Sequence, residues 1–128
     1  ELIAFSTHLK SGTHYHLYRD QKGLIGVVGE NVLTQDGHPS CHSENAFVLT
    51  DTYPNRFLER ELLLFNNEKS SVDQLGAFYS SPALAGEMRC DLHPRWSPTG
   101  SMICFDSAHA GKRRVCVLSS TRDSQWWS

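Results

Sequence analysis

The sequence contains an internal repeat, and this feature limits the possible folds more than any other. One copy begins at His38 and its apolar run ends at Asp51, while a second begins at His93 and ends in the same way at Asp106. In both copies the histidine is followed directly by proline. A weaker third copy lies upstream, over residues 14–28. Repeats of this kind indicate one supersecondary unit per copy, with the units stacked against one another.

The copies predict an all-β fold. Each contains short runs rich in Val, Ile, Leu and Phe that are bounded by turn-forming residues, and such runs are typical of strands. One four-stranded antiparallel unit per repeat is the pattern of β-propeller blades. We expect a single domain of three blades, at approximately residues 1–36, 37–80 and 81–128. Because propellers close with roughly four to eight blades, three blades predict a partial propeller whose partner is the rest of a longer one.

Two further segments carry local predictions. Residues 96–100 read Trp-Ser-Pro-Thr-Gly, which favours a type I turn. Residues 76–87 form a long connection of small and aromatic residues, which is either an irregular loop over a binding face or a short helical turn. Cys104 and Cys116 lie in strand-like runs and are expected to be packed thiols. A bridge between neighbouring strands is the alternative, and it would indicate an oxidising compartment.

Composition excludes several classes of partner. Lys and Arg number 12 and Asp and Glu 14, so the formal charge is −2 and no basic run marks a nucleic-acid surface. No apolar stretch reaches the roughly 20 residues that span a bilayer. The chain opens on a strand-like run, residues 1–5, without an initiator Met or a secretory signal. We therefore expect a piece of a longer protein, with any targeting signal outside this sequence.

Histidines at the repeat starts predict a metal site. His14, His38 and His93 occupy matching places in the three copies, each expected just before the innermost strand of a blade. Radial symmetry would bring such positions together at the mouth of the central channel. His16 is a fourth candidate, because it lies two residues from His14 on the same side of a strand. Imidazoles gathered in this way suit Mn, Fe, Ni or Zn, and Asp91 is a nearby carboxylate that could complete the ligand set.

Each of these residues also has a structural interpretation. A histidine at a blade start can hydrogen-bond the backbone of the neighbouring blade, and this alternative stays open for His38 and His93. Arg89 and Arg95 suit bidentate binding of a substrate carboxylate, or simple ion pairing at a surface. The remaining polar residues are assigned to structure: turn capping for Asp51 and Asp106, and loop or surface positions for His8, His42 and His109.

The sequence resembles the oligogalacturonate lyase-like propellers, which are relatives of the TolB-type propeller. The resemblance is carried by residues 86–100 together with 103–107, by residues 48–54, and by residues 13–16 with Asp20. It spans approximately residues 8–118. The Trp-Ser-Pro-x-Gly turn occurs in many propellers, whereas histidines at blade starts are more specific.

The resemblance implies a metal-dependent polysaccharide lyase of the cytoplasm, with the periplasm as the alternative compartment. Such enzymes cleave uronate oligosaccharides by β-elimination, with a divalent ion, typically manganese, held by three histidines and a glutamine. His93 matches the first member of the family's His-x-His pair. Arg95 stands where the second histidine is found, and Cys90 where the glutamine is found.

Three functional hypotheses follow. The first is a metal-dependent lyase acting on oligogalacturonate, with metal ligands and substrate-binding arginines as named above and no residue identified as catalytic base. The second is a non-catalytic, TolB-like binding or scaffold propeller. The third is a glycoside hydrolase with paired carboxylates, for which Asp51 and Asp106 are the candidates. The expected partner is an oligosaccharide, and neither a nucleic acid nor a membrane is expected.

Overall fold

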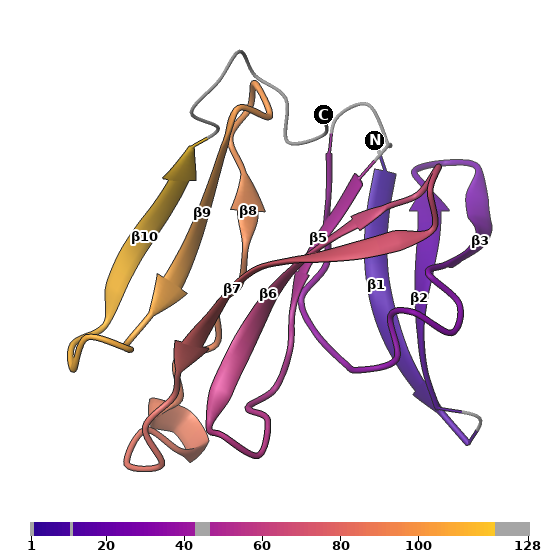
Figure 1. Cartoon of the computed structure of the whole chain (residues 1–128). Coiled ribbons are helices and arrows are strands. Elements are labelled where there is room, and N and C mark those ends of the chain that lie inside the picture. Colours follow the sequence, from indigo (N-terminus) through magenta and orange to yellow (C-terminus); the bar gives the residue numbers. More distant parts are fainter. Residues whose placement is uncertain (1, 11, 43–46, 120–128) are drawn as a thin grey trace.

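The computed structural model describes residues 2–10, 12–42 and 47–119 of the chain. These residues form an all-β fold of antiparallel sheets, none of which is closed (Figure 1). In chain order the elements are β1 (Leu2–Leu9), β2 (Gly12–Arg19), β3 (Gly23–Val28), β4 (Ser40–Cys41), β5 (Phe47–Asp51), β6 (Glu59–Asn66), β7 (Ser71–Tyr79), a short 3₁₀ helix (Gly86–Met88), β8 (Arg95–Trp96), β9 (Met102–Ser107) and β10 (Arg114–Ser119).

Strands that follow one another in sequence pair with one another. The three sheets have the orders β1-β2-β3, β4-β5-β6-β7 and β8-β9-β10, so each is a simple antiparallel meander. The sheets fall within the three units expected from the repeat, residues 1–36, 37–80 and 81–128. In the described part of the chain only the middle sheet has four strands, and the outer two have three each.

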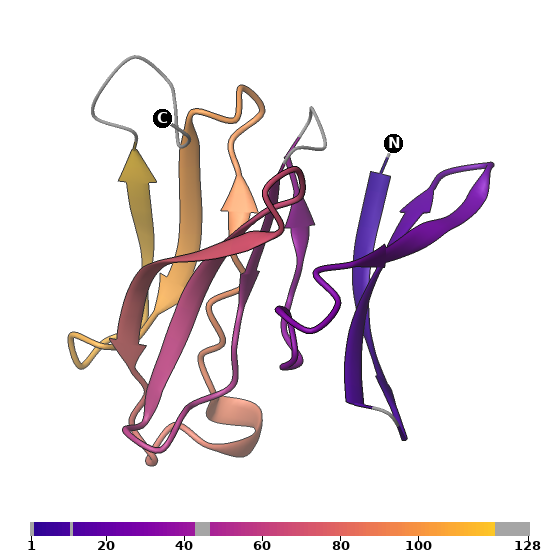
Figure 2. The ribbon, with the colours of Figure 1, turned by 45° about the vertical axis from the view of Figure 1, so that its right-hand side comes forward.

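The first strands of the three sheets lie next to one another. β4, the first strand of the middle sheet, contacts both β1 and β8, which are the first strands of the outer sheets. Figure 2 shows β8, β4 and β1 in succession, with the later strands of each sheet spreading away from them. The segments that lead into β4 and β8 are therefore neighbours in space, although a complete sheet separates them in sequence.

The middle sheet is covered on both faces by apolar side chains. Along β5, Phe47 and Leu49 pack toward the third sheet, where they meet Ile103. Val48 points the other way and packs with Tyr15 of the first sheet. This alternation follows from the two-residue period of a strand, and it leaves every residue of β5 buried.

The local predictions have mixed outcomes. The turn at residues 97–100 is confirmed, because the Gly100 N–H donates to the Ser97 carbonyl at 2.8 Å with glycine in the left-handed region (φ 70°). The connection expected over residues 76–87, as an irregular loop or a short helical turn, is wrong in its first part. Residues 76–79 continue β7, where Gly76 pairs with Leu62, and the short 3₁₀ helix follows later in the connection.

The four cysteines are free thiols. Cys104 is paired with Val117 and Cys116 with Phe105 in the ladder between β9 and β10. Cys104 and Cys116 therefore lie on opposite faces of the sheet, and a bridge between these two strands is excluded by the register.

The described residues contain no helical segment with the length and hydropathy of a transmembrane span.

Candidate metal and anion site

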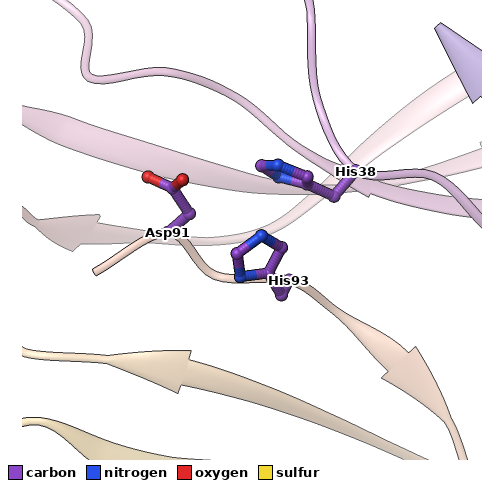
Figure 3. A group of neighbouring side chains, drawn as sticks. All are labelled: His38, Asp91 and His93. Atoms are coloured by element: carbon purple, nitrogen blue, oxygen red, sulfur yellow. The ribbon is translucent and has the colours of Figure 1, made fainter. Parts of the chain in front are cut away.

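Two of the predicted histidines meet. His38 lies just before β4 and His93 just before β8, so the contact between these first strands places the two side chains together. Their ring centroids are 4.0 Å apart and the ring planes are tilted by 58°. Figure 3 shows both rings beside the carboxylate of Asp91. The prediction that matching repeat positions converge therefore applies to the second and third copies.

A buried carboxylate holds both histidines in place. Asp51, at the end of β5, is 1% exposed. Its Oδ1 accepts hydrogen bonds from the main-chain N–H of His38 at 2.8 Å and from the His38 ring nitrogen Nδ1 at 3.0 Å. Its Oδ2 accepts a third from the main-chain N–H of His93 at 3.0 Å. A carboxylate on Nδ1 fixes the tautomer that leaves Nε2 of His38 with a free lone pair, which is the usual support of a metal-binding histidine.

Asp91 supplies the third donor. His38, Asp91 and His93 each offer one ligand atom, and these atoms lie within 4.8 Å of one another. Asp91 is buried, whereas the ring of His93 is exposed and that of His38 is partly exposed. The group thus combines an inner carboxylate with two imidazoles that face outward.

Two arginines pair with the same carboxylate. Arg60 Nη2 lies 2.8 Å from Asp91 Oδ1, and Arg89 Nε lies 2.8 Å from Oδ2. The Arg60 side chain is only 6% exposed, whereas that of Arg89 is 48% exposed. The hydrogen bond to Asp91 raises the pKa of Arg89 above its ordinary value. Arg60 therefore pairs with Asp91 inside the protein, whereas Arg89 presents part of its side chain to solvent.

The donor types fit a divalent ion. Two imidazoles and one carboxylate are ligands that Mn, Fe and Zn accept, and Asp51 gives one imidazole its supporting partner. Ligand atoms around a bound ion are roughly 3 to 3.5 Å apart when each is about 2.1 Å from it. Binding would therefore draw the three donors closer together. It would also have to compete with the two guanidinium groups for Asp91.

The site opens to solvent. A shallow depression beside the histidines is lined by Gly86, Glu87, Arg89, Asp91 and His93. Arg113 supports its rim, because its Nη2 donates to the carbonyls of residues 88 and 89 at 3.1 Å each. An anionic ligand in the depression would face the guanidinium of Arg89 and the imidazole of His93, and also the carboxylates of Glu87 and Asp91, of which Asp91 is already paired with arginine.

His14 and His16 lie elsewhere. Both are inside β2, the second strand of the first sheet, and so do not occupy the place before a first strand that His38 and His93 share. Nε2 of His16 is 2.9 Å from the Thr7 hydroxyl. Among the described residues, the group able to hold a metal includes neither His14 nor His16. The repeat predicted that His14 stands at the first strand of its sheet. It lies instead in the second strand, because β1 precedes it.

Neither Arg95 nor Cys90 belongs to the group of described residues that could hold a metal ion. Arg95 Nη1 lies 3.4 Å from Asp106 Oδ2 on the face of the third sheet. Hydrogen bonding to the Cys104 thiol, and then to Asp106, raises the pKa of Arg95. Burial raises the pKa of the Cys90 thiol, which disfavours the thiolate that a metal requires. Of the two predicted substrate-binding arginines, Arg89 reaches the depression and Arg95 makes a surface ion pair.

Three sequence assignments need correction or addition. Asp51 was expected to cap a turn, but it is buried and organises the site. His42 was expected at the surface, but it is 5% exposed and its ring lies 4.9 Å from that of Trp96. His8 lies within β1 and the exposure of its side chain is outside what the structure describes, while His109 is exposed as expected. Arg60 was missed altogether, since a single arginine in a strand-like run carries no signal that it is buried.

No protein-family model matches the chain, and no curated protein matches it significantly.

Proposed function

We propose that the chain forms part of a β-propeller. Three meander sheets pack face to face, and their first strands are adjacent, as innermost strands are around a propeller axis. The middle sheet buries both faces, which is the position of a blade between two others. The location of His38 and His93 just before first strands then corresponds to the mouth of a central channel.

We further propose that the site belongs to a metal-dependent lyase that acts on oligogalacturonate. The observation that carries this proposal is the meeting of two imidazoles from matching positions of adjacent sheets, beside Asp91. His38, His93 and Asp91 would hold the ion, for which the resemblance implies manganese. Arg89, half exposed at the edge of the depression, would bind a uronate carboxylate.

The residues have separate tasks in the reaction. A bound divalent ion would act as a Lewis acid on the uronate carboxylate and acidify the adjacent C–H. Arg89 would orient that carboxylate, and Asp51 would hold the His38 ring in its ligating tautomer. In β-elimination the C–H proton leaves to a base, its electron pair forms a carbon–carbon double bond, and the glycosidic oxygen departs and takes up a proton. We assign no residue to the base.

Metal content and product formation test this proposal. We expect wild-type protein to bind manganese and to release an unsaturated uronate from oligogalacturonate, followed by its ultraviolet absorbance. His93→Ala should lose both properties. His109→Ala is the matched control, because His109 is an exposed histidine outside the site. Equal metal content in wild type and His93→Ala would rule out the proposed ligand set.

One observation favours a second candidate, a non-catalytic TolB-like binding propeller. Both oxygens of Asp91 are already paired with guanidinium groups, and this neutralisation suits a site that binds anions without a metal. Binding of oligogalacturonate by metal-free protein, with no absorbing product even after manganese is added, would identify this function.

We also propose a reducing location, the cytoplasm, on the basis of the four free thiols. Cysteine alkylation of protein purified from its native source would show four reactive thiols after unfolding if this is correct.

A further inference from the structure

A second hollow lies next to the depression. It has a volume of about 180 Å³. Tyr53, Pro54, Leu58 and Ala85 give it apolar walls, and Arg60 and Arg89 contribute the charged part of the lining. An apolar cavity of roughly 150 Å³ is large enough for benzene, so this hollow has room for one six-membered ring. Apolar walls with a few polar groups are typical of small-molecule sites.

The walls are held by local hydrogen bonds. On one side, Asn55 Oδ1 accepts from the N–H groups of Phe57 and Glu59 at 2.9 and 3.1 Å, which fixes the turn that carries Leu58. On the other side, the Leu84 N–H donates to the Ser81 carbonyl at 2.9 Å. The shape of the hollow therefore exists before any ligand arrives, and little ordering is required on binding.

The hollow favours an anion. The guanidinium carbons of Arg60 and Arg89 both lie 5.8 Å from the centre of the Tyr53 ring. The two positive charges share one carboxylate, that of Asp91, so one charge is in excess. Of the described residues that line the hollow, none is acidic. The exposed part of the Arg89 side chain is the group best placed to meet an incoming carboxylate.

The hollow is continuous with the proposed reaction site. Gly86 and Arg89 line both the hollow and the depression beside His93. A linear ligand with two rings could therefore place one ring in each, with Arg89 at the junction.

We propose that the hollow is a subsite for a second uronate unit, in which Tyr53 packs against the apolar face of the sugar ring, while Arg89 at the junction stays with the carboxylate of the unit in the depression. This inference rests on the proposed function only for the choice of uronate as the ring. Among the walls of the subsite, Tyr53 is 42% exposed and therefore has surface that a sugar ring could cover. The aromatic face would bury the C–H groups of the ring, and the excess positive charge of the Arg60 and Arg89 pair would attract its carboxylate.

Calorimetric titration of the full chain with galacturonate and with digalacturonate tests the subsite. Wild-type protein should bind digalacturonate about tenfold more tightly than the monomer, and Tyr53→Ala should remove most of that difference. Ala85→Phe, which fills the hollow without removing a wall, should have the same effect. Tyr18→Ala is the matched control, because Tyr18 is a similarly exposed tyrosine (37%) of the first sheet. Thermal melting establishes that each variant is folded.

The outcomes separate the subsite from the lyase. Tyr53-dependent binding of digalacturonate without metal and without product would support the subsite and remove the lyase. Product formation with digalacturonate affinity unchanged in folded Tyr53→Ala and Ala85→Phe would overturn the subsite and leave the lyase in place. Wild-type protein that binds neither sugar overturns the subsite as well.

Discussion

The carboxylate of Asp51 accepts a hydrogen bond at 3.0 Å from the main-chain N–H of His93, a residue 42 positions further along the chain. This bond joins the end of β5 in the middle sheet to the segment that leads into the third sheet. The other oxygen of the Asp51 carboxylate accepts a hydrogen bond from the main-chain N–H of His38. One buried side chain therefore sets the distance between the two imidazoles of the candidate site.

Asp51→Asn should weaken both the fold and the site. An amide offers one oxygen, so at least one of the three N–H groups now bonded to Asp51 would be buried without an acceptor, at a cost of about 1–3 kcal/mol in the free energy of unfolding. The amide NH₂ would also favour the opposite tautomer of His38, with its proton on Nε2. Metal affinity should fall about 10- to 100-fold.

Urea denaturation and ¹⁵N NMR of the imidazoles measure these effects. Asp106→Asn is the control from the matching repeat position, because Asp106 is more exposed and its contact with Arg95 is 3.4 Å long. If Asp51→Asn changed neither stability nor the His38 tautomer, the organising role of Asp51 would be wrong.

Arg60→Leu should be far more damaging than Arg89→Leu. Both arginines pair with Asp91 at 2.8 Å, but Arg60 is buried and Arg89 is half exposed. Removal of the buried partner leaves Oδ1 of the buried Asp91 carboxylate without this guanidinium, while Oδ2 keeps Arg89, and we expect a loss of up to about 3 kcal/mol. Arg89→Leu should lower stability much less, because an exposed ion pair contributes little. Denaturant midpoints compare the two, and equal losses would contradict the assignment of Arg60 to the interior.

Stability should fall at high pH through Tyr15. Burial, which is the largest effect, raises the pKa of Tyr15 to about 12, and the nearby charges of Asp51 and Asp36 add to the rise. Below about pH 10 the phenol is protonated in both states and its contribution is complete. Between about pH 10 and 12 the unfolded chain loses its proton first, so the free energy of unfolding drops, by up to roughly 3 kcal/mol.

Tyr15→Phe should remove this part of the pH dependence, although it also removes the hydrogen bond from the Tyr15 hydroxyl to the Gln35 carbonyl. Urea titrations at a series of alkaline pH values measure the slope. Tyr18→Phe, at an exposed tyrosine, should keep the wild-type slope. Parallel curves for wild type and Tyr15→Phe above about pH 10 would contradict the shifted pKa.

Gly37→Ala should disturb the site through packing. A Cβ at this position would collide with the Asp51 carbonyl oxygen, and it would lie 2.8 Å from both the Thr50 and the Tyr15 hydroxyl oxygens. Overpacking of this kind costs about 1–3 kcal/mol, and the displacement would reach His38, the next residue. Gly26→Ala is the matched control, since a Cβ there meets nothing within 4 Å. Thermal melting and metal titration distinguish the two, and a Gly37→Ala protein with unchanged metal affinity would count against the tight packing.

The sequence was most informative where chemistry is local or repeated. The His-Pro pairs at 38 and 93 predicted two equivalent sheet starts, and their convergence follows from the adjacency of β4 and β8. Pro98 and Gly100 predicted a turn whose hydrogen bond needs only four consecutive residues. Such features depend on short stretches of chain, which a single sequence displays directly.

The sequence was least informative where a partner is distant. Asp51 and Asp106 recur at one offset, which suggested a common role as turn caps, yet only Asp51 is covered by a following sheet and becomes a buried acceptor. Arg60 is buried in an ion pair with Asp91, and no periodicity in the sequence connects those two residues. His14 was matched by residue type alone, and the preceding strand β1 shifted it from a first strand into a second.

The complete burial of β5 has a consequence for how this chain can change. Its five residues supply apolar groups to two separate cores and, through Asp51, the acceptor that orients His38. Rearranged packing on either side is therefore transmitted to the imidazoles. Directed evolution toward a different ligand should accumulate its substitutions in the segments around Tyr53 and Arg89, and should leave this strand untouched.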